Sequence, residues 1–278
     1  MEILRYVAFS TDPKGGNPAG VVLDAAGADD TAMQAVATEV GYSETAFAVE
    51  AGDGLLDVRY FSPLAEVPFC GHATIATAVA HARAHGTGRL RLRTQAGPIT
   101  VTTDRAEDGT VVATLVSVEP RTAPIPQAVL AELLAALRWP AEDLDPALPP
   151  RAAFAGAWHP VVAAGSRGRL ADLDYDGPAL TALMHREGWT TVDLVWRESP
   201  TVFHARNPFP PGGVVEDPAT GAAAAAFGGY LRELDLVCPP TTLTIHQGVD
   251  MGRPSTITVS VPAGPHTGIG VTGTAVPI

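Results

Sequence analysis

Two stretches of the sequence place titratable side chains directly before a run of small residues. The first is Glu66–His72, which carries a thiol at Cys70 and an imidazole at His72, and the second is Glu216–Gly221, which carries two carboxylates. The runs that follow are small and apolar on every side, which is typical of a helix buried all round. The start of a buried helix has free N–H groups and the positive end of the helix dipole. Each stretch therefore predicts an anion-binding site.

The motifs that suggest a cofactor or a metal fail on their context. Gly268–Gly273 matches the dinucleotide fingerprint G-x-G-x-x-G, but too little chain follows for the helix and the acidic residue that this motif needs. Lys14, the only lysine available for a pyridoxal Schiff base, lies in a glycine-rich loop. His81 and His85 have helical metal-ligand spacing without an H-E-x-x-H motif, so we interpret them as residues at the wet end of a helix. We expect no cofactor and no metal, and chemistry from carboxylates, imidazole, thiol and backbone amides.

The two helices belong to a longer pattern that occurs twice. We expect central helices over residues 71–85 and 221–233, each followed by a β-rich run that ends at a glutamine, Gln95 or Gln247. Runs of alternating β-branched residues come next, at Ile99–Thr103 and Thr256–Ser260. Agreement in order and spacing predicts a duplicated unit. Coincidence between alanine-rich helices in an alanine-rich chain is the alternative.

The elements before the first buried helix must position an isolated glutamate, Glu44. We expect a strand at Ile3–Phe9 and a glycine- and proline-rich loop at Thr11–Gly20. A helix is then capped near Asp29 and ends near Gly41. Glu44 follows at the junction between this helix and the next strand, among apolar neighbours.

Length and composition favour two domains with full cores. The chain has 278 residues, of which 46% are hydrophobic and 17% are charged. The repeat and the proline-rich connector Glu119–Pro126 divide it into halves at residues 1–118 and 119–278. The final strand, predicted at Gly268–Val276, can return to the first half.

The net charge and the cysteine content limit which partners and which cellular compartment we expect. A net charge of −12 argues against nucleic acid or an anionic membrane surface as partner. No apolar run reaches the roughly 18 residues of a membrane span, and the first residues lack the apolar core of a secretory signal. Two cysteines are too few for a disulfide framework. We therefore expect a cytoplasmic protein that does not bind a membrane.

Five motifs that occur in order resemble one family. They are Gly16–Gly20, Ser43–Phe47, Cys70–Thr74, Glu216–Gly221 and Gln247–Pro254. Together they resemble the PhzF-like family of phenazine-biosynthesis isomerases and, more distantly, the diaminopimelate epimerases and proline racemases. The resemblance spans essentially the whole chain. It implies an α+β fold of two similar β-barrel-like halves, each wrapped around a central apolar helix, with the active site in the cleft between them. We also expect a homodimer.

The resemblance implies roles for particular residues. Glu44 is the acid/base, His72 contacts the substrate, and Asp217 holds a polar group of the substrate. Paired amides at the two helix starts would bind the substrate's carboxylate. The residues implied in substrate binding are Asn17, Gly71, Ala73, Thr220, Gly221, Ala222 and Gln247.

Departures from the family pattern bear on the substrate and on the base. Family members commonly have a serine after the D-P-A-T-G run, where this chain has Ala222, and Arg206–Phe209 replaces the more usual approach to that run. The epimerase branch uses two opposed cysteines as bases. Here Cys70 occupies one such place and Thr220 the other, and a threonine hydroxyl cannot act as this base at neutral pH. We therefore interpret Cys70 as a small buried filler.

We expect a cofactor-independent isomerase that moves a proton on a small carboxylate-bearing molecule of secondary metabolism, with Glu44 as the shuttle. Two alternatives stay open. One is a one-base epimerase or dehydratase of a cyclic amino acid that uses Cys70, and the other is a non-catalytic binding module on the same fold. The presence of Glu44, His72 and Asp217 argues against the binding module, which has no need of an acid/base trio.

Overall fold

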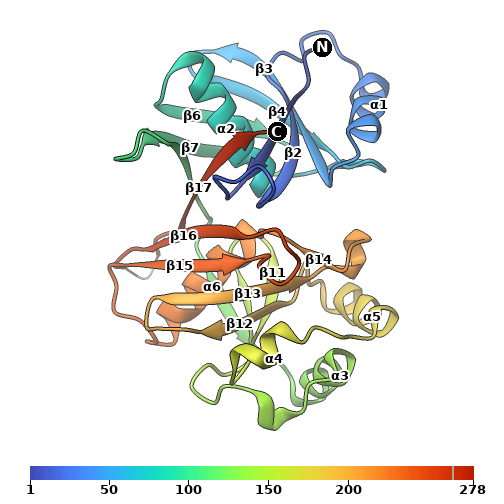
Figure 1. Cartoon of the computed structure of the whole chain (residues 1–278), viewed down its shortest axis with the longest axis vertical. Helices are drawn as coiled ribbons and strands as arrows, with labels where there is room; N and C mark the ends of the chain where they lie inside the picture. The colour runs from blue at the N-terminus through green and yellow to red at the C-terminus, as the bar shows by residue number, and fades with distance from the viewer. Residues whose placement is uncertain (265) are drawn as a thin grey trace. The chain divides into compact units, whose positions relative to one another are not determined.

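A computed structural model describes residues 1–264 and 266–278 of the chain, and the chain divides into two compact units (Figure 1). The first unit comprises Met1–Val116 and Thr272–Ile278, and the second comprises Ser117–Val271. The last strand, β17 (Gly270–Pro277), therefore begins in the second unit and ends in the first.

The strands of the first unit close into a barrel. In the order of their pairing, β1 is followed by β2, β3, β4, β6, β7, β8 and β17, and β17 pairs with β1 again. The neighbours β2 and β3 are parallel, as are β4 and β6. The elements of this unit are β1 (Leu4–Ala8), β2 (Asn17–Val22), α1 (Asp30–Val40), β3 (Glu44–Gly52), β4 (Leu55–Phe61), β5 (Glu66–Val67), α2 (Gly71–His85), β6 (Arg89–Thr94), β7 (Gly97–Arg105) and β8 (Val111–Val116).

The barrel surrounds α2, which packs against β1, β2, β3, β7 and β8 (Figure 1). Its residues from His72 to Ala80 are all buried, as the run of small apolar residues predicts. Small side chains allow the surrounding strands to approach the helix backbone from every direction. The helix leaves the barrel at its C-terminal end, where His81 is half-buried and His85 is exposed, which confirms their interpretation as residues at a wet helix end.

The second unit wraps a sheet around its own central helix. The strands pair in the order β9, β10, β11, β12, β13, β15 and β16, with β11–β12 and β13–β15 parallel. The central helix α6 packs against β9, β10, β11 and β16. The elements are β9 (Arg121–Pro124), α3 (Gln127–Leu137), the 3₁₀ helix η1 (Ala141–Asp143), β10 (Arg151–Phe154), β11 (Trp158–Ala163), α4 (Arg167–Ala171), α5 (Gly177–Glu187), β12 (Asp193–Arg197), β13 (Val202–Pro208), η2 (Pro210–Gly212), β14 (Glu216–Asp217), α6 (Gly221–Glu233), β15 (Thr241–Gln247) and β16 (Ser255–Val261).

Both units repeat one order of elements, which confirms the predicted fold class. In each unit an antiparallel strand pair leads into a two-residue strand, β5 or β14, and then into the central helix. The strand after the helix lies parallel to the strand before it, β4–β6 in one unit and β13–β15 in the other, and a hairpin strand follows. The two glutamines of the repeat differ in their surroundings, because Gln95 is exposed and Gln247 is buried.

Two segments predicted as loops contain strands. The predicted loop at Thr11–Gly20 ends earlier, because Gly16 turns the chain at φ +59° and β2 starts at Asn17, between β1 and β3. The predicted connector Glu119–Pro126 contains β9, which pairs with β10. In both segments, pairing with strands remote in the sequence overrides the turn tendency of glycine and proline.

Candidate active site

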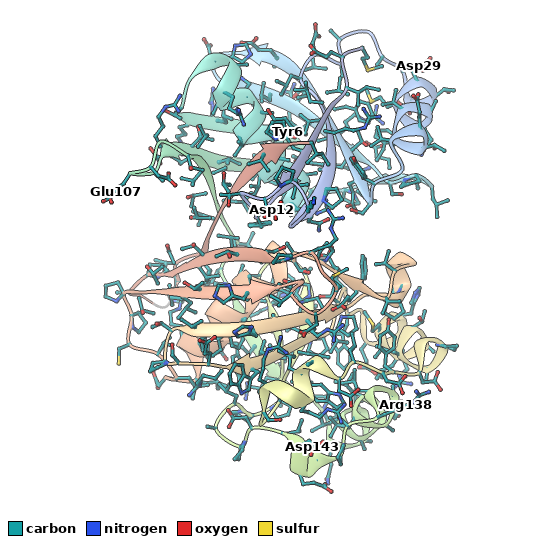
Figure 2. All side chains as sticks on the ribbon, viewed as in Figure 1. Tyr6, Asp12, Asp29, Glu107, Arg138 and Asp143 are labelled. Carbon is teal, nitrogen blue, oxygen red and sulfur yellow. The ribbon has the colours of Figure 1, made fainter. Side chains whose placement is uncertain are left out.

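Glu44 is the first residue of β3, and the helix before it determines this position. Asp29, labelled beside α1 in Figure 2, caps the helix by accepting a hydrogen bond from the Ala32 N–H at 2.8 Å. Gly41 ends the helix in the left-handed conformation. The chain then enters β3, where Glu44 lies beside Ala19 of the parallel strand β2. The Glu44 side chain is 18% exposed, so its carboxylate is shielded but reaches solvent.

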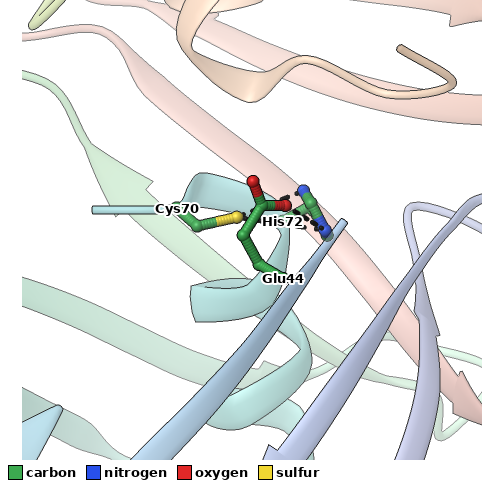
Figure 3. A group of neighbouring side chains, drawn as sticks. All are labelled: Glu44, Cys70 and His72. Carbon is green, nitrogen blue, oxygen red and sulfur yellow. Dashed lines mark hydrogen bonds and ion pairs between the residues drawn. The ribbon is translucent and has the colours of Figure 1, made fainter. Parts of the chain in front are cut away.

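His72 lies in the first turn of α2 and faces Glu44 (Figure 3). Its Nε2 is 3.5 Å from Oε2 of Glu44 and 3.4 Å from Oγ of Ser43. On the other side of the ring, Nδ1 is 3.2 Å from Nδ2 of Asn17, which is buried at the start of β2. The imidazole thus has polar neighbours at both nitrogens, and the Glu44 carboxylate lies on the Nε2 side.

Cys70 contacts the same imidazole. It is the N-cap residue of α2, and its Sγ lies 3.3 Å from Nδ1 and 3.9 Å from Nε2 of His72 (Figure 3). The interpretation of Cys70 as a filler is therefore incomplete, because the thiol is buried against a polar partner rather than in apolar packing alone. The contact was not expected from the sequence, although two residues at i and i+2 around a helix start are close enough to touch.

A short chain of hydrogen bonds fixes the N-terminal turn of α2. The Thr74 hydroxyl donates to the Cys70 carbonyl at 2.7 Å, and the Tyr60 hydroxyl lies 2.7 Å from the same Thr74 oxygen. Burial raises the pKa of Tyr60, so this phenol stays neutral at ordinary pH. The bracing leaves the first N–H groups of the helix, including those of Gly71 and Ala73, directed out of its N-terminal end.

In the second unit, Asp217, Thr220 and Gln247 form one hydrogen-bonded cluster. The Thr220 hydroxyl donates to Oδ2 of Asp217 at 2.5 Å. The Gln247 amide donates to the Asp217 carbonyl at 2.7 Å and to the Thr220 hydroxyl at 3.0 Å, and its oxygen accepts from the Thr220 N–H at 3.0 Å. Gly221 and Ala222 follow as the half-buried first residues of α6. Gln247 thus positions the start of α6 with both ends of its amide.

The strand that carries Asp217 is anchored by an ion pair that was not expected from the sequence. Asp217 pairs with Asn207 through β14 and β13, and the neighbouring Glu216 forms a buried, bidentate ion pair with Arg206. Arg206 also donates to the Ala171 carbonyl at 2.6 Å. The segment Arg206–Phe209, which departs from the family pattern, therefore contributes a residue that supports the strand carrying Asp217. The signal available in sequence was the pairing of an arginine and a glutamate across a short hairpin.

A buried polar network joins β13, the strand that pairs with β14, to β12 and β11. The Thr191 hydroxyl donates to Oδ1 of Asn207 at 2.7 Å, and the Asn207 amide donates to Asp193 at 3.1 Å. His159 approaches the Thr191 hydroxyl with Nδ1 at 2.8 Å. Burial raises the pKa of Asp193 to about 7 and lowers the pKa of His159 to about 4. Both groups therefore favour their neutral forms in the folded unit.

The backbone around Gly248 shows why the Gln247–Pro254 motif has a glycine at this position. Its φ of +73° is a left-handed conformation, and a Cβ there would lie 2.3 Å from the Arg253 carbonyl oxygen and 2.8 Å from that of Pro218. Ser255 donates to the same Pro218 carbonyl at 2.8 Å. This tight turn therefore packs on the chain that leads into α6.

The predicted site residues thus fall into two sets, each assembled within its own unit. The first set is Asn17, Glu44, Gly71, His72 and Ala73, around the start of α2. The second set is Asp217, Thr220, Gly221, Ala222 and Gln247, around the start of α6. Among the described residues, Glu44, Cys70 and His72 also form a group whose ligand atoms lie within 4.8 Å of one another, close enough to share a metal ion.

Residues 6–278 match the family described as phenazine biosynthesis-like protein. The chain belongs to the PhzC/PhzF family. This membership confirms the resemblance drawn from the five ordered motifs.

Curated relatives of this PhzC/PhzF protein are named isomerases. It is 31% identical over 266 residues to a protein of Escherichia coli named uncharacterized isomerase YddE, covering 94% of this chain and 90% of that protein. It is 33% identical over 253 residues to trans-2,3-dihydro-3-hydroxyanthranilate isomerase of Pseudomonas chlororaphis, covering 89% of this chain and 86% of that enzyme. The predicted enzyme class, isomerase, is confirmed.

Solved structures confirm the fold of this PhzC/PhzF protein. A PhzF family protein of Bacillus anthracis superposes with a TM-score of 0.87 at 25% identity, covering 100% of this chain and 98% of that one. A probable proline racemase of Agrobacterium radiobacter superposes with a TM-score of 0.67 at 13% identity, covering 99% of this chain and 90% of that one. The second likeness shows a shared fold, that of the epimerases and racemases. Among the described residues, no helix is both long enough and apolar enough to cross a membrane.

Proposed function

We propose that this PhzC/PhzF protein moves a proton from one carbon to another within a small carboxylate-bearing molecule, without a cofactor. The observation that carries the proposal is the pairing of Glu44 with His72, whose Oε2 and Nε2 atoms lie 3.5 Å apart at the start of α2. A shielded carboxylate beside an oriented imidazole is suited to general acid–base chemistry. The isomerase names of the curated relatives support the same reaction class.

Glu44 is the group that takes and returns the proton. Its carboxylate accepts a proton as a C–H bond of the substrate breaks, and the resulting carboxylic acid gives that proton to a second carbon as the double bond shifts. The proton count is unchanged, so neither an oxidant nor a reductant is needed. His72 orients the carboxylate through Nε2, while Asn17 holds the other side of its ring at 3.2 Å.

The N–H groups of the first turn of each central helix are suited to binding an anion such as a carboxylate within their own unit. At the start of α2 these belong to Gly71 and Ala73, and at the start of α6 to Gly221 and Ala222. Asp217 holds a polar group of the substrate, and Thr220 and Gln247 keep that carboxylate in place. These roles extend the family resemblance to residues that two separate hydrogen-bonded clusters already orient.

The substrate class that we propose is a dihydroaromatic or otherwise allylic acid of secondary metabolism. Support comes from the Pseudomonas chlororaphis relative, whose name includes trans-2,3-dihydro-3-hydroxyanthranilate. Ala222 has a methyl group and no hydroxyl, so it favours a substrate that needs no side-chain hydrogen bond at this position. We further propose that the protein acts in the cytoplasm and that it is a homodimer. Light scattering on the purified protein tests the homodimer, and cell fractionation tests the compartment.

A one-base epimerase that uses Cys70 is the second candidate. The contact that favours it is the 3.3 Å distance between Sγ of Cys70 and Nδ1 of His72, which resembles a thiol beside its base. The two candidates differ in what happens to the proton. A glutamate shuttle moves it between two carbons on one face of the substrate, whereas a one-base epimerase takes it from one carbon and returns a proton to the opposite face of that same carbon.

The test uses wild type, Glu44→Gln and a matched control, Glu39→Gln, which changes an exposed glutamate on α1. Each is incubated in D₂O with trans-2,3-dihydro-3-hydroxyanthranilate and with a panel of allylic carboxylates, and the products are followed by NMR. We expect Glu44→Gln to lose about 10²–10⁴-fold in turnover, and Glu39→Gln to match wild type. Protium carried from donor to acceptor carbon supports the shuttle. Wild-type turnover by Glu44→Gln, or inversion with complete deuteration, overturns it.

A further inference from the structure

We propose that Glu44, Cys70 and His72 form a binding site for a thiophilic divalent cation, with Zn²⁺ as the ion that fits best. The three side chains come from the start of β3 and the start of α2, and their ligand atoms lie within 4.8 Å of one another (Figure 3). Sulfur, imidazole nitrogen and carboxylate oxygen together are a donor set that zinc accepts, whereas Mg²⁺ and Ca²⁺ select oxygen alone.

The spacing of the atoms is close to that of a tetrahedral site. Zinc lies about 2.3 Å from sulfur and about 2.0–2.2 Å from nitrogen or oxygen, so two ligand atoms of one tetrahedron are about 3.3–3.6 Å apart. Nε2 of His72 is 3.5 Å from Oε2 of Glu44 and 3.9 Å from Sγ of Cys70. The Glu44 oxygen and the Cys70 sulfur lie within 4.8 Å of each other, so side-chain rotations that shorten this third distance bring all three atoms to one ion.

The nitrogen that faces the ion is Nε2, because Nδ1 has a different partner. Asn17 is buried and lies 3.2 Å from Nδ1. With its amide turned so that the oxygen faces the ring, it accepts a hydrogen bond from Nδ1–H and leaves the Nε2 lone pair for the metal. A buried amide or carboxylate in this position is the usual support of a metal-bound histidine. The Sγ–Nδ1 contact of 3.3 Å is exchanged for the metal bond.

Three protein ligands leave the fourth position for water or for a ligand. The 18% exposure of the Glu44 side chain gives solvent a route to the group. An ion held there occupies the Glu44 oxygen that takes and returns the proton. Zinc therefore inhibits the isomerase, and this consequence, unlike binding itself, rests on the proposed function.

Other histidines can attract divalent ions, and sulfur separates them from this site. The rings of His81 and His85 have centroids 4.6 Å apart, and those of His204 and His246 are 5.2 Å apart. Neither pair includes a cysteine. Only a thiolate ligand gives cobalt an intense charge-transfer absorption in the near ultraviolet, so Co²⁺ is the probe for the proposed site.

The experiment titrates Co²⁺ into the full chain carrying Cys238→Ser, which removes the exposed second cysteine. We expect a charge-transfer band that saturates at one Co²⁺ per chain and disappears on addition of Zn²⁺. The band should be absent from Cys70→Ala and Cys70→Ser in the same background, with far-ultraviolet circular dichroism unchanged. Asn17→Ala should weaken Co²⁺ binding about 10–100-fold, as expected for the loss of a partner behind a metal-bound histidine.

Absence of the band from the Cys238→Ser protein overturns the proposal, and so does its persistence in both Cys70 variants. Turnover is measured separately, with and without Zn²⁺. A cobalt band in a protein that isomerises nothing leaves the metal site standing and removes the proposed function. Turnover without a band does the reverse, so the two failures are distinguishable.

Discussion

Removal of the Gln247 side chain should destabilise the second unit at the start of α6. Its buried amide makes three hydrogen bonds, one from the Thr220 N–H, one to the Asp217 carbonyl and one to the Thr220 hydroxyl. Each is worth about 0.5–1.5 kcal/mol, so Gln247→Ala should lower the free energy of unfolding by roughly 2–4 kcal/mol. The lower end applies if water enters and replaces some of the lost partners.

The tryptophans make this measurement specific. Trp139, Trp158, Trp189 and Trp196 all lie in the second unit. Their fluorescence during urea unfolding therefore reports that unit by itself. The matched control is Gln127→Ala, which changes an exposed glutamine of the same unit and should stay within about 0.5 kcal/mol of wild type.

Hydrogen exchange at single amides shows which part of the second unit is destabilised. The Thr220 N–H donates to Gln247, so its exchange should accelerate in Gln247→Ala and stay unchanged in Gln127→Ala. If Gln247→Ala unfolds within about 0.5 kcal/mol of wild type, or if exchange at Thr220 does not change, the amide does not position the start of α6 and the reasoning fails.

Three further results are expected. Cys70→Ala should keep turnover within a few-fold of wild type, since the partner position is Thr220, and a loss of about a thousandfold would assign the base to Cys70. Ala222→Ser should improve binding of dihydroxylated phenazine-type acids by about 0.5–1.5 kcal/mol, measured by calorimetry, and no response from any ligand means that residue 222 does not face the substrate. Folded Asp193 keeps a proton, with its pKa raised to about 7, that the unfolded chain releases near 3.8, so this residue lowers stability as the pH rises from about 4 to 7. His159, with its pKa lowered from 6.5 to about 4, acts in the opposite direction, because it raises stability as the pH rises from about 4 to 6.5. In Asp193→Asn the stability measured by tryptophan fluorescence should therefore rise more steeply with pH than in wild type, by up to about 1.4 kcal/mol per pH unit, and parallel pH profiles would contradict this.

Local signals were enough to predict the framework of the candidate site. The central helices α2 (Gly71–His85) and α6 (Gly221–Glu233) begin and end where their small-residue runs predict. The cap at Asp29 and the glycine stop at Gly41 predict α1, and with it the position of Glu44 at the start of β3. These features depend on residues within a few positions of each other, so the sequence by itself determines them.

Contacts between remote segments were decided only by the tertiary structure. Gln95 and Gln247 occupy equivalent places in the repeat, yet only Gln247 is buried, because Asp217 and Thr220 lie within reach of its amide. The ion pair of Arg206 with Glu216 also depends on how β14 folds back on β13. Hydrogen bonds of this kind have no periodicity in sequence, so pattern analysis has nothing to detect.

The group at the start of α2 shows the same division most clearly. The order of Glu44, Cys70 and His72 in the chain identifies candidates for acid–base chemistry. The contact of the thiol with the imidazole is local, since Cys70 and His72 are two residues apart. That the Glu44 carboxylate also lies within 4 Å of this imidazole follows only from the packing of β3 against α2 inside the barrel. Residue type determines which chemistry is available to each side chain, and the burial of α2 determines which side chains share it.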